Sequence, residues 1–151
     1  MRTLAQSVAA FIPLFLAISV NAQTPSDFTG HWRQQTNSET QRQLDIEQNG
    51  QSLLVKAMVT NSQGTRHLEV KYVIGGPETS YKGLDGDEFR SSVRWDGSTL
   101  VFDTVEHEGG REIPEKAVWT LLGDRNTLQV ARQSAKSART AHSLTTYVRQ
   151  P

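Results

Sequence analysis

The sequence contains no cysteine, which excludes disulfide bonds, thiolate metal sites and a cysteine nucleophile. It has no surplus of either charge, because 16 lysine and arginine residues balance 16 aspartate and glutamate residues. A protein that follows nucleic acid along its phosphates needs many cations, so this balance argues against a nucleic-acid binder. The sequence also lacks a nucleophile elbow, a phosphate-binding glycine loop and an HExxH pair. We therefore predict a protein that is not an enzyme and that uses no cofactor.

Long apolar runs are also missing, apart from one near the start of the chain. Ala9–Val20 is apolar over 12 residues, which is too short for a helix that spans a bilayer. Arg2 precedes this run, and small residues follow it at a suitable cleavage position. Residues 1–22 are therefore predicted to be a secretory signal peptide, and residues 23–151 the mature domain. A secreted chain of this size without disulfides favours a bacterial periplasm.

The mature segment shows no apolar set at helical spacing. Apolar and polar residues alternate instead, and Gly, Asn and Asp interrupt the alternation, which is typical of short strands joined by turns. The predicted strands are Thr29–Gln34, Arg42–Gln48, Gln51–Thr60, Arg66–Ile74, Thr79–Lys82, Glu88–Trp95, Ser98–Glu106, Ile113–Leu122, Thr127–Gln133 and His142–Arg149. The short links favour an all-β, antiparallel up-and-down meander. We expect it to close into a barrel of eight to ten strands, with a sandwich as the alternative.

Two turns predict strand register. Asn-Gly and Asp-Gly are favoured in two-residue hairpin loops, because both central positions need positive φ. The predicted cross-strand pairs are Val93–Leu100, Ser91–Phe102 and Arg90–Asp103 around Asp96-Gly97, and Ile46–Leu53 and Leu44–Val55 around Asn49-Gly50. On the last strand, Leu144, Thr146 and Val148 are predicted to complete the inward set.

The segment Asp27-Phe28-Thr29-Gly30-His31-Trp32 resembles the GxW signature of lipocalins, in the form found in lipocalin-like domains of small secreted bacterial proteins. The resemblance implies a lipocalin-like, calycin-type barrel in which Gly30 and Trp32 close one end. It also implies that Arg149 packs across the Trp32 ring through a cation–π contact. Fatty-acid-binding proteins share this start but place two helices after the first strand. Because residues 33–43 are too few for two helices, an open barrel without that lid is the better match.

A barrel of this size is either filled by its own side chains or holds one small ligand. The ligand-lining candidates combine aromatic and aliphatic side chains, which suit a small-molecule pocket. These candidates are Leu68, Val70, Tyr72, Phe89, Val93, Phe102 and Trp119. The leading hypothesis is non-catalytic binding of a small apolar or amphipathic ligand. A second hypothesis is a packed-core domain that docks a protein partner through its charged surface, and a third is a barrel enzyme with His67 or Glu69 inside.

The densest group of potential metal ligands is Glu106-His107-Glu108. Strand alternation places the two carboxylates on one side and the imidazole on the other, so the ligands diverge and we predict no metal site. Residues 134–141, which include Lys136, are predicted to form a mobile loop. The outward residues of the predicted strands include Asp45, Lys56 and Arg94, and this pattern argues against a barrel that spans a membrane.

Overall fold

The computed structural model describes residues 25–136 and 141–151, which form ten strands and no helix. The strands are β1 (Gly30–Gln34), β2 (Gln41–Asn49), β3 (Ser52–Asn61), β4 (Gly64–Val73), β5 (Thr79–Lys82), β6 (Glu88–Asp96), β7 (Thr99–Glu108), β8 (Arg111–Leu121), β9 (Thr127–Ser134) and β10 (Ala141–Gln150). The predicted signal peptide, residues 1–22, lies outside the described residues, as do residues 137–140 of the predicted mobile loop.

The ten strands form one antiparallel sheet in the order β4-β3-β2-β1-β10-β9-β8-β7-β6-β5. Pairing of β1 with β10 brings the two ends of the meander together, which confirms the predicted up-and-down barrel. Between the described strands β4 and β5 there is no ladder, and side chains bridge the gap. Thr79 Oγ1 donates to the Lys71 carbonyl at 3.3 Å, and Arg66 Nη1 donates to the Leu84 carbonyl at 3.3 Å. The barrel is therefore nearly closed.

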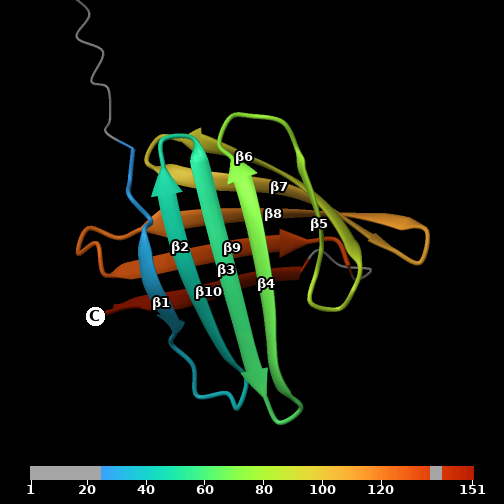
Figure 1. Cartoon of the computed structure of the whole chain (residues 1–151), viewed down its shortest axis with the longest axis horizontal. Coiled ribbons are helices and arrows are strands. Elements are labelled where there is room, and N and C mark those ends of the chain that lie inside the picture. The colour runs from blue at the N-terminus through green and yellow to red at the C-terminus, as the bar shows by residue number, and fades with distance from the viewer. Residues whose placement is uncertain (1–24, 137–140) are drawn as a thin grey trace, which may run out of the picture.

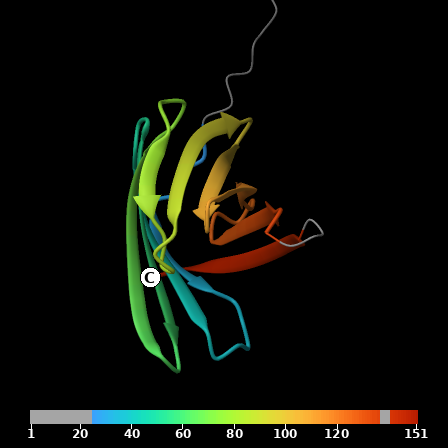
Figure 2. The ribbon, with the colours of Figure 1, turned by 90° about the vertical axis from the view of Figure 1, so that its right-hand side faces the viewer.

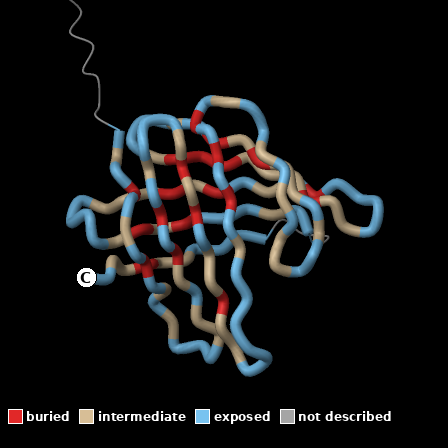
Figure 3. The backbone as a smooth tube through the Cα atoms, viewed as in Figure 1, coloured by how far each residue is buried: buried red, intermediate tan, exposed pale blue. Residues whose placement is uncertain are grey.

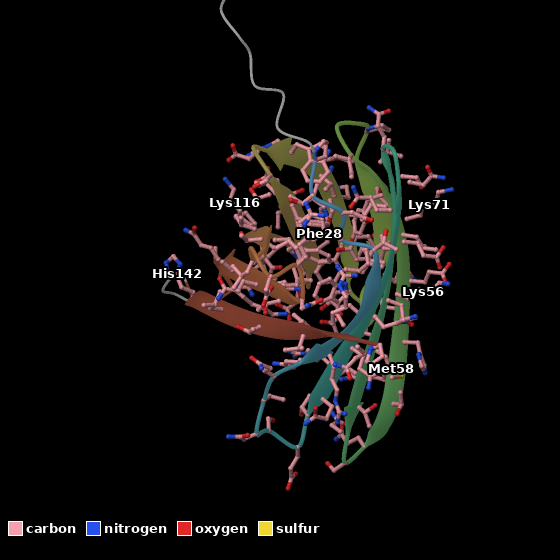
Figure 4. All side chains as sticks on the ribbon, turned by 90° about the vertical axis from the view of Figure 1, so that its left-hand side faces the viewer. Phe28, Lys56, Met58, Lys71, Lys116 and His142 are labelled. Atoms are coloured by element: carbon pink, nitrogen blue, oxygen red, sulfur yellow. The ribbon has the colours of Figure 1, made fainter. Side chains whose placement is uncertain are left out.

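The barrel has two layers, with β2, β3 and β4 crossing steeply in front of β7, β8 and β9 (Figure 1). Seen from the side, the layers stand apart along one edge (Figure 2). Phe28 lies between them, whereas Lys56 and Lys71 project outward from β3 and β4 (Figure 4). This arrangement follows from strand alternation, which sends apolar side chains to the shared interior and charged ones to water.

The buried residues concentrate where the two layers cross, and the far ends of β3 and β4 are mostly exposed (Figure 3). The core includes Trp32, Leu53, Leu100 and Leu128, each at most 1% exposed. One end of the barrel, where β1 begins and β10 ends, is therefore packed solid. The opposite end, where β3 turns into β4, is called the mouth below.

Both predicted hairpin registers are wrong by two residues. The observed pairs are Val93–Phe102, Ser91–Thr104, Trp95–Leu100, Ile46–Val55, Leu44–Ala57 and Asn49–Ser52. Each loop therefore consists of the glycine and the residue after it, and only Gly50 and Gly97 in these loops have positive φ, at 58° and 59°. Hairpin loops with glycine at the first central position need only that one positive φ. A register shift of two residues leaves every side chain on the same face of the sheet, so the residues predicted to point inward on these hairpins do point inward.

The shift does change the predicted ion pair across β6 and β7. Arg90 lies opposite Val105 rather than Asp103. Its guanidinium instead contacts Glu112 on β8, with 3.0 Å between Nη2 and Oε1. Asp103 pairs with Arg94, with 3.5 Å between Nε and Oδ2. Because these pairs are exposed, each contributes little to stability.

The predicted facing of β10 is also wrong. Leu144 is 62% exposed, whereas Tyr147 is 4% exposed and belongs to the core. Tyr147 and Arg149 lie two residues apart, so both side chains face the interior, and Arg149 reaches the packed end of the barrel. Since alternation then fixes the whole strand, Leu144, Thr146 and Val148 face outward.

Candidate functional site

The packed end of the barrel is closed by Phe28 and Trp32. Trp32 is 1% exposed, and its Nε1 donates to the Phe28 carbonyl at 2.9 Å. The Arg149 guanidinium carbon lies 4.3 Å from the centre of the Trp32 ring, as the resemblance implies. Arg149 also donates to the Thr29 carbonyl, and a Cβ at Gly30 would overlap its guanidinium. Gly30 also has a φ of 148°, which L residues rarely adopt, so glycine is favoured beside the arginine. The described side chains at this end are tightly packed.

The mouth leads into a cavity of about 530 Å³. This volume lies within the range of sites that enclose small organic molecules. Trp119 and Tyr72, which are 5% and 8% exposed, contribute to the aromatic part of the lining. The interior is therefore not filled by side chains alone, in contrast to the packed core that the second sequence-based hypothesis requires.

One wall of the cavity, the apolar wall, comes from the layer of β2, β3 and β4. It consists of Leu44, Val55, Ala57, Leu68 and Val70. These residues continue the inward phase of each strand from the packed end toward the mouth. They offer a ligand dispersion contacts and removal of its apolar surface from water.

The facing wall, the polar wall, comes from β7, β8, β9 and β10. Its residues are Thr104, Glu106, Glu115, Arg132, Thr145 and Tyr147. Arg132 Nη1 lies 3.0 Å from Glu115 Oε1. Lys136 Nζ lies 2.6 Å from Glu106 Oε1, and Glu106 is 6% exposed. The polar wall thus holds these charges in neutralising pairs, and the ammonium of Lys136 offsets the cost of burying the Glu106 carboxylate.

Sequence reasoning missed these charged wall residues, although their signal was present. Arg132 follows Leu128 and Val130 at spacing two, and Glu115 precedes Ala117 and Trp119 at the same spacing. If the alternation of inward residues on β8 and β9 is continued toward the mouth, both side chains fall on the inner face of the barrel.

Five of the seven predicted lining residues do line the cavity. These are Leu68, Val70, Tyr72, Phe89 and Trp119. Val93 and Phe102 do not. Phe102 packs against Trp119 and Tyr72, with ring centres 4.6 and 5.4 Å apart, and Val93 lies beside it on β6. These two predicted residues therefore belong to the core behind the cavity.

Two tyrosines give the cavity neutral hydrogen-bond donors. Burial raises the pKa of Tyr72 and of Tyr147 above the ordinary tyrosine value, so both keep their O–H groups at neutral pH. The positive charges of Arg132 and Arg42 partly oppose that increase in the pKa of Tyr147. Arg42 lies at the mouth and has no acidic partner within 4.0 Å among the described residues.

Asp85, Asp87 and Glu106 form an acidic group at the mouth, with carboxylate oxygens within 4.8 Å of one another. The Lys136 ammonium already bonds Glu106, so this group has a cation of its own. In the segment Glu106-His107-Glu108, His107 faces away from the cavity, and its Nε2 accepts from Arg90 Nε at 3.1 Å. His67 and Glu69, the residues named for a barrel enzyme, are both exposed on β4.

Comparisons with known proteins add evidence on the fold. No family model matches the sequence. No curated protein matches it either. Among residues 25–136 and 141–151, no helix is long and apolar enough to cross a bilayer.

Solved structures do match. A REP1-NXSQ fatty acid transporter shares 12% identity at a TM-score of 0.63, over 82% of this chain and 96% of that one. The zebrafish ileal bile-acid-binding protein with cholic acid shares 14% identity at a TM-score of 0.58, over 82% of this chain and 98% of that one. Secretory abundant heat soluble protein 4 of Ramazzottius varieornatus shares 12% identity at a TM-score of 0.64, over 82% of this chain and 94% of that one.

Identities this low establish the fold alone. The similar structures include fatty-acid-binding proteins, which the sequence comparison had set aside for their two helices. Residues 35–40, between β1 and β2, indeed contain no helix. The chain therefore folds as a ten-stranded, calycin-like β-barrel with a mouth that no helix between β1 and β2 covers.

Proposed function

We propose that the protein binds one small amphipathic molecule with an acidic group inside the barrel, without catalysis. The observation that supports this most directly is the cavity of about 530 Å³ between an apolar wall and a polar wall. The similar solved structures include a fatty acid transporter and a bile-acid-binding protein, which support the same class of ligand.

The acidic group of the ligand is proposed to lie near Arg42, Arg132 and Tyr147. Arg42 lacks an acidic partner among the described residues, so a carboxylate there gains a charge-assisted hydrogen bond without displacing another anion. Arg132 and the neutral Tyr147 hydroxyl extend the same donor group into the cavity. The apolar skeleton of the ligand would then pack on Val55 and Val70.

Binding without catalysis is supported by how the cavity hydroxyls bond. Among the described lining residues, Thr104 and Tyr81 bond to the buried Ser91, and neither bonds to a histidine or carboxylate that could remove its proton. A hydroxyl nucleophile needs such a base within hydrogen-bonding distance. The cavity is therefore suited to hold a molecule rather than to transform it.

Filling the cavity should abolish binding. Ala57 lies on the apolar wall, and Ala57→Trp places an indole in the ligand space. We expect a dansylated C11 fatty acid to bind the wild type saturably and the variant about 100-fold more weakly, a loss of about 2.7 kcal/mol. Fluorescence titration of the purified protein measures both affinities.

Ala131→Trp is the matched control, because Ala131 is exposed on the outer face of β9. This variant should bind the probe as the wild type does. Equal affinity of the wild type and Ala57→Trp would show that the probe binds outside the cavity. Absence of saturable binding to the wild type would also contradict the proposal.

We also propose that the protein is exported, on the basis of residues 1–22. Expression of the full chain in a Gram-negative bacterium should then release a periplasmic protein that begins at Gln23. Mass spectrometry of the periplasmic fraction measures the mature start. A full-length cytoplasmic product that retains Met1 would contradict export.

A further inference from the structure

Three hydroxyl groups form a chain across β5, β6 and β7. Tyr81 Oη lies 3.1 Å from Ser91 Oγ, and Ser91 Oγ lies 2.8 Å from Thr104 Oγ1. Ser91 is 1% exposed and has Thr104 directly opposite on the neighbouring strand. The two ends of the chain, Tyr81 and Thr104, line the cavity, whereas the middle hydroxyl lies behind them.

The number of protons in this chain determines what it offers a ligand. Each hydroxyl has one donor, so three hydroxyls supply three protons, and the two internal bonds use two of them. The third proton cannot stay on Ser91 without leaving a buried donor unpaired, which is costly. It therefore emerges at Thr104 or at Tyr81. In either state the chain presents a donor at one end and an acceptor at the other.

This chain lies beside the charged part of the polar wall. Thr104 is the cross-strand partner of Glu115, which bonds Arg132. The wall thus presents a neutral hydrogen-bonding position next to an ion pair, on strands that face the apolar wall of β2, β3 and β4. The polar wall and the apolar wall therefore face each other across the cavity.

We propose that Thr104 and Tyr81 form a subsite for a neutral oxygen, a hydroxyl or carbonyl, on the ligand. The ligand is accordingly an amphiphile that has its oxygen substituents along one face of an apolar skeleton, in addition to its acidic group. This inference rests on the proposed function of the cavity and specifies the chemical class of its ligand.

Two acids with the same steroid skeleton test the subsite. Cholic acid has hydroxyls on one face of its rings, and 5β-cholanic acid has none. In an apolar cavity the hydroxyls would lose water without compensation, so cholanic acid would bind more tightly. We expect the reverse order, with cholic acid about five- to tenfold tighter, because the chain bonds a ring hydroxyl. Displacement of the dansylated fatty acid measures both.

Variants test whether the three hydrogen-bonded hydroxyls cause the preference for cholic acid. Thr104→Val should weaken cholic acid binding about five- to tenfold and leave cholanic acid binding unchanged. Tyr81→Phe, which keeps the ring that stacks on Phe89, should act in the same direction. Thr146→Val is the matched control, because Thr146 faces outward on β10 and should alter neither affinity. Urea unfolding verifies that each variant is folded.

The outcomes separate this inference from the proposed function. If cholanic acid binds as tightly as cholic acid, or Thr104→Val changes both affinities equally, the subsite is refuted while enclosure of an amphiphile stands. If the probe shows no saturable binding, or if it binds and neither steroid acid nor palmitic acid displaces it, the proposed function and the subsite both fail.

Discussion

Replacing Trp32 with alanine is expected to lower the free energy of unfolding by about 3–5 kcal/mol. The indole is 1% exposed at the packed end of the barrel, and the variant would leave a cavity that the surrounding strands cannot fill. It would also remove the hydrogen bond to the Phe28 carbonyl and the surface on which Arg149 packs. Urea denaturation followed by far-UV circular dichroism measures the change.

Trp32→Phe is the graded control for this prediction. It keeps an aromatic ring but removes the indole N–H, which leaves the Phe28 carbonyl without that donor. The expected loss is about 1–3 kcal/mol, smaller than for alanine. A loss below about 1 kcal/mol for Trp32→Ala would mean that the packed end contributes little to stability, contrary to the role we assign it.

The second large effect is expected from Leu128→Ala. Leu128 is fully buried on β9, so the variant should lose about 2–5 kcal/mol of unfolding free energy through lost burial and cavity formation. Leu144→Ala removes the same atoms from β10, where the side chain is 62% exposed, and should change stability by no more than about 0.5 kcal/mol. Thermal and urea unfolding of the pair measure the difference.

The comparison of these two leucines also tests the facing of β10. If Leu144→Ala were as destabilising as Leu128→Ala, Leu144 would point inward, as the alternation of the last strand predicted. A small effect would agree with a strand whose inward residues are Tyr147 and Arg149. The stability difference therefore distinguishes two arrangements that the same sequence pattern allows.

Local patterns predicted the strands well because each depends on neighbouring residues. All ten predicted strands are present, and Thr79–Lys82 has the predicted bounds. The hairpin at Gly97 shows the limit of such patterns. Asp-Gly indicates a turn, but the loop contains Gly97 and the residue after it, because a single positive φ suffices there. A turn motif thus locates a hairpin more accurately than it locates the cross-strand partners.

The candidate site was only partly predictable. Leu68, Val70 and Trp119 line the cavity as expected, because apolar residues in alternation must share one face. Phe102 has the same pattern but belongs to the core, since the rings of Tyr72 and Trp119 pack against it and line the cavity in its place. Alternation specifies the side of the sheet that a residue faces, and it contains no information on which inward side chains cover one another.

Residue order alone determined the all-β class, the meander and the face of most side chains, because these depend on contacts between neighbours in the chain. The presence of a cavity and the composition of its walls depended on long-range geometry. Arg132 meets Glu115 at the cavity wall because β8 and β9 pair in one particular register. The two layers leave about 530 Å³ between them because the whole sheet, closed through β1 and β10, sets their separation.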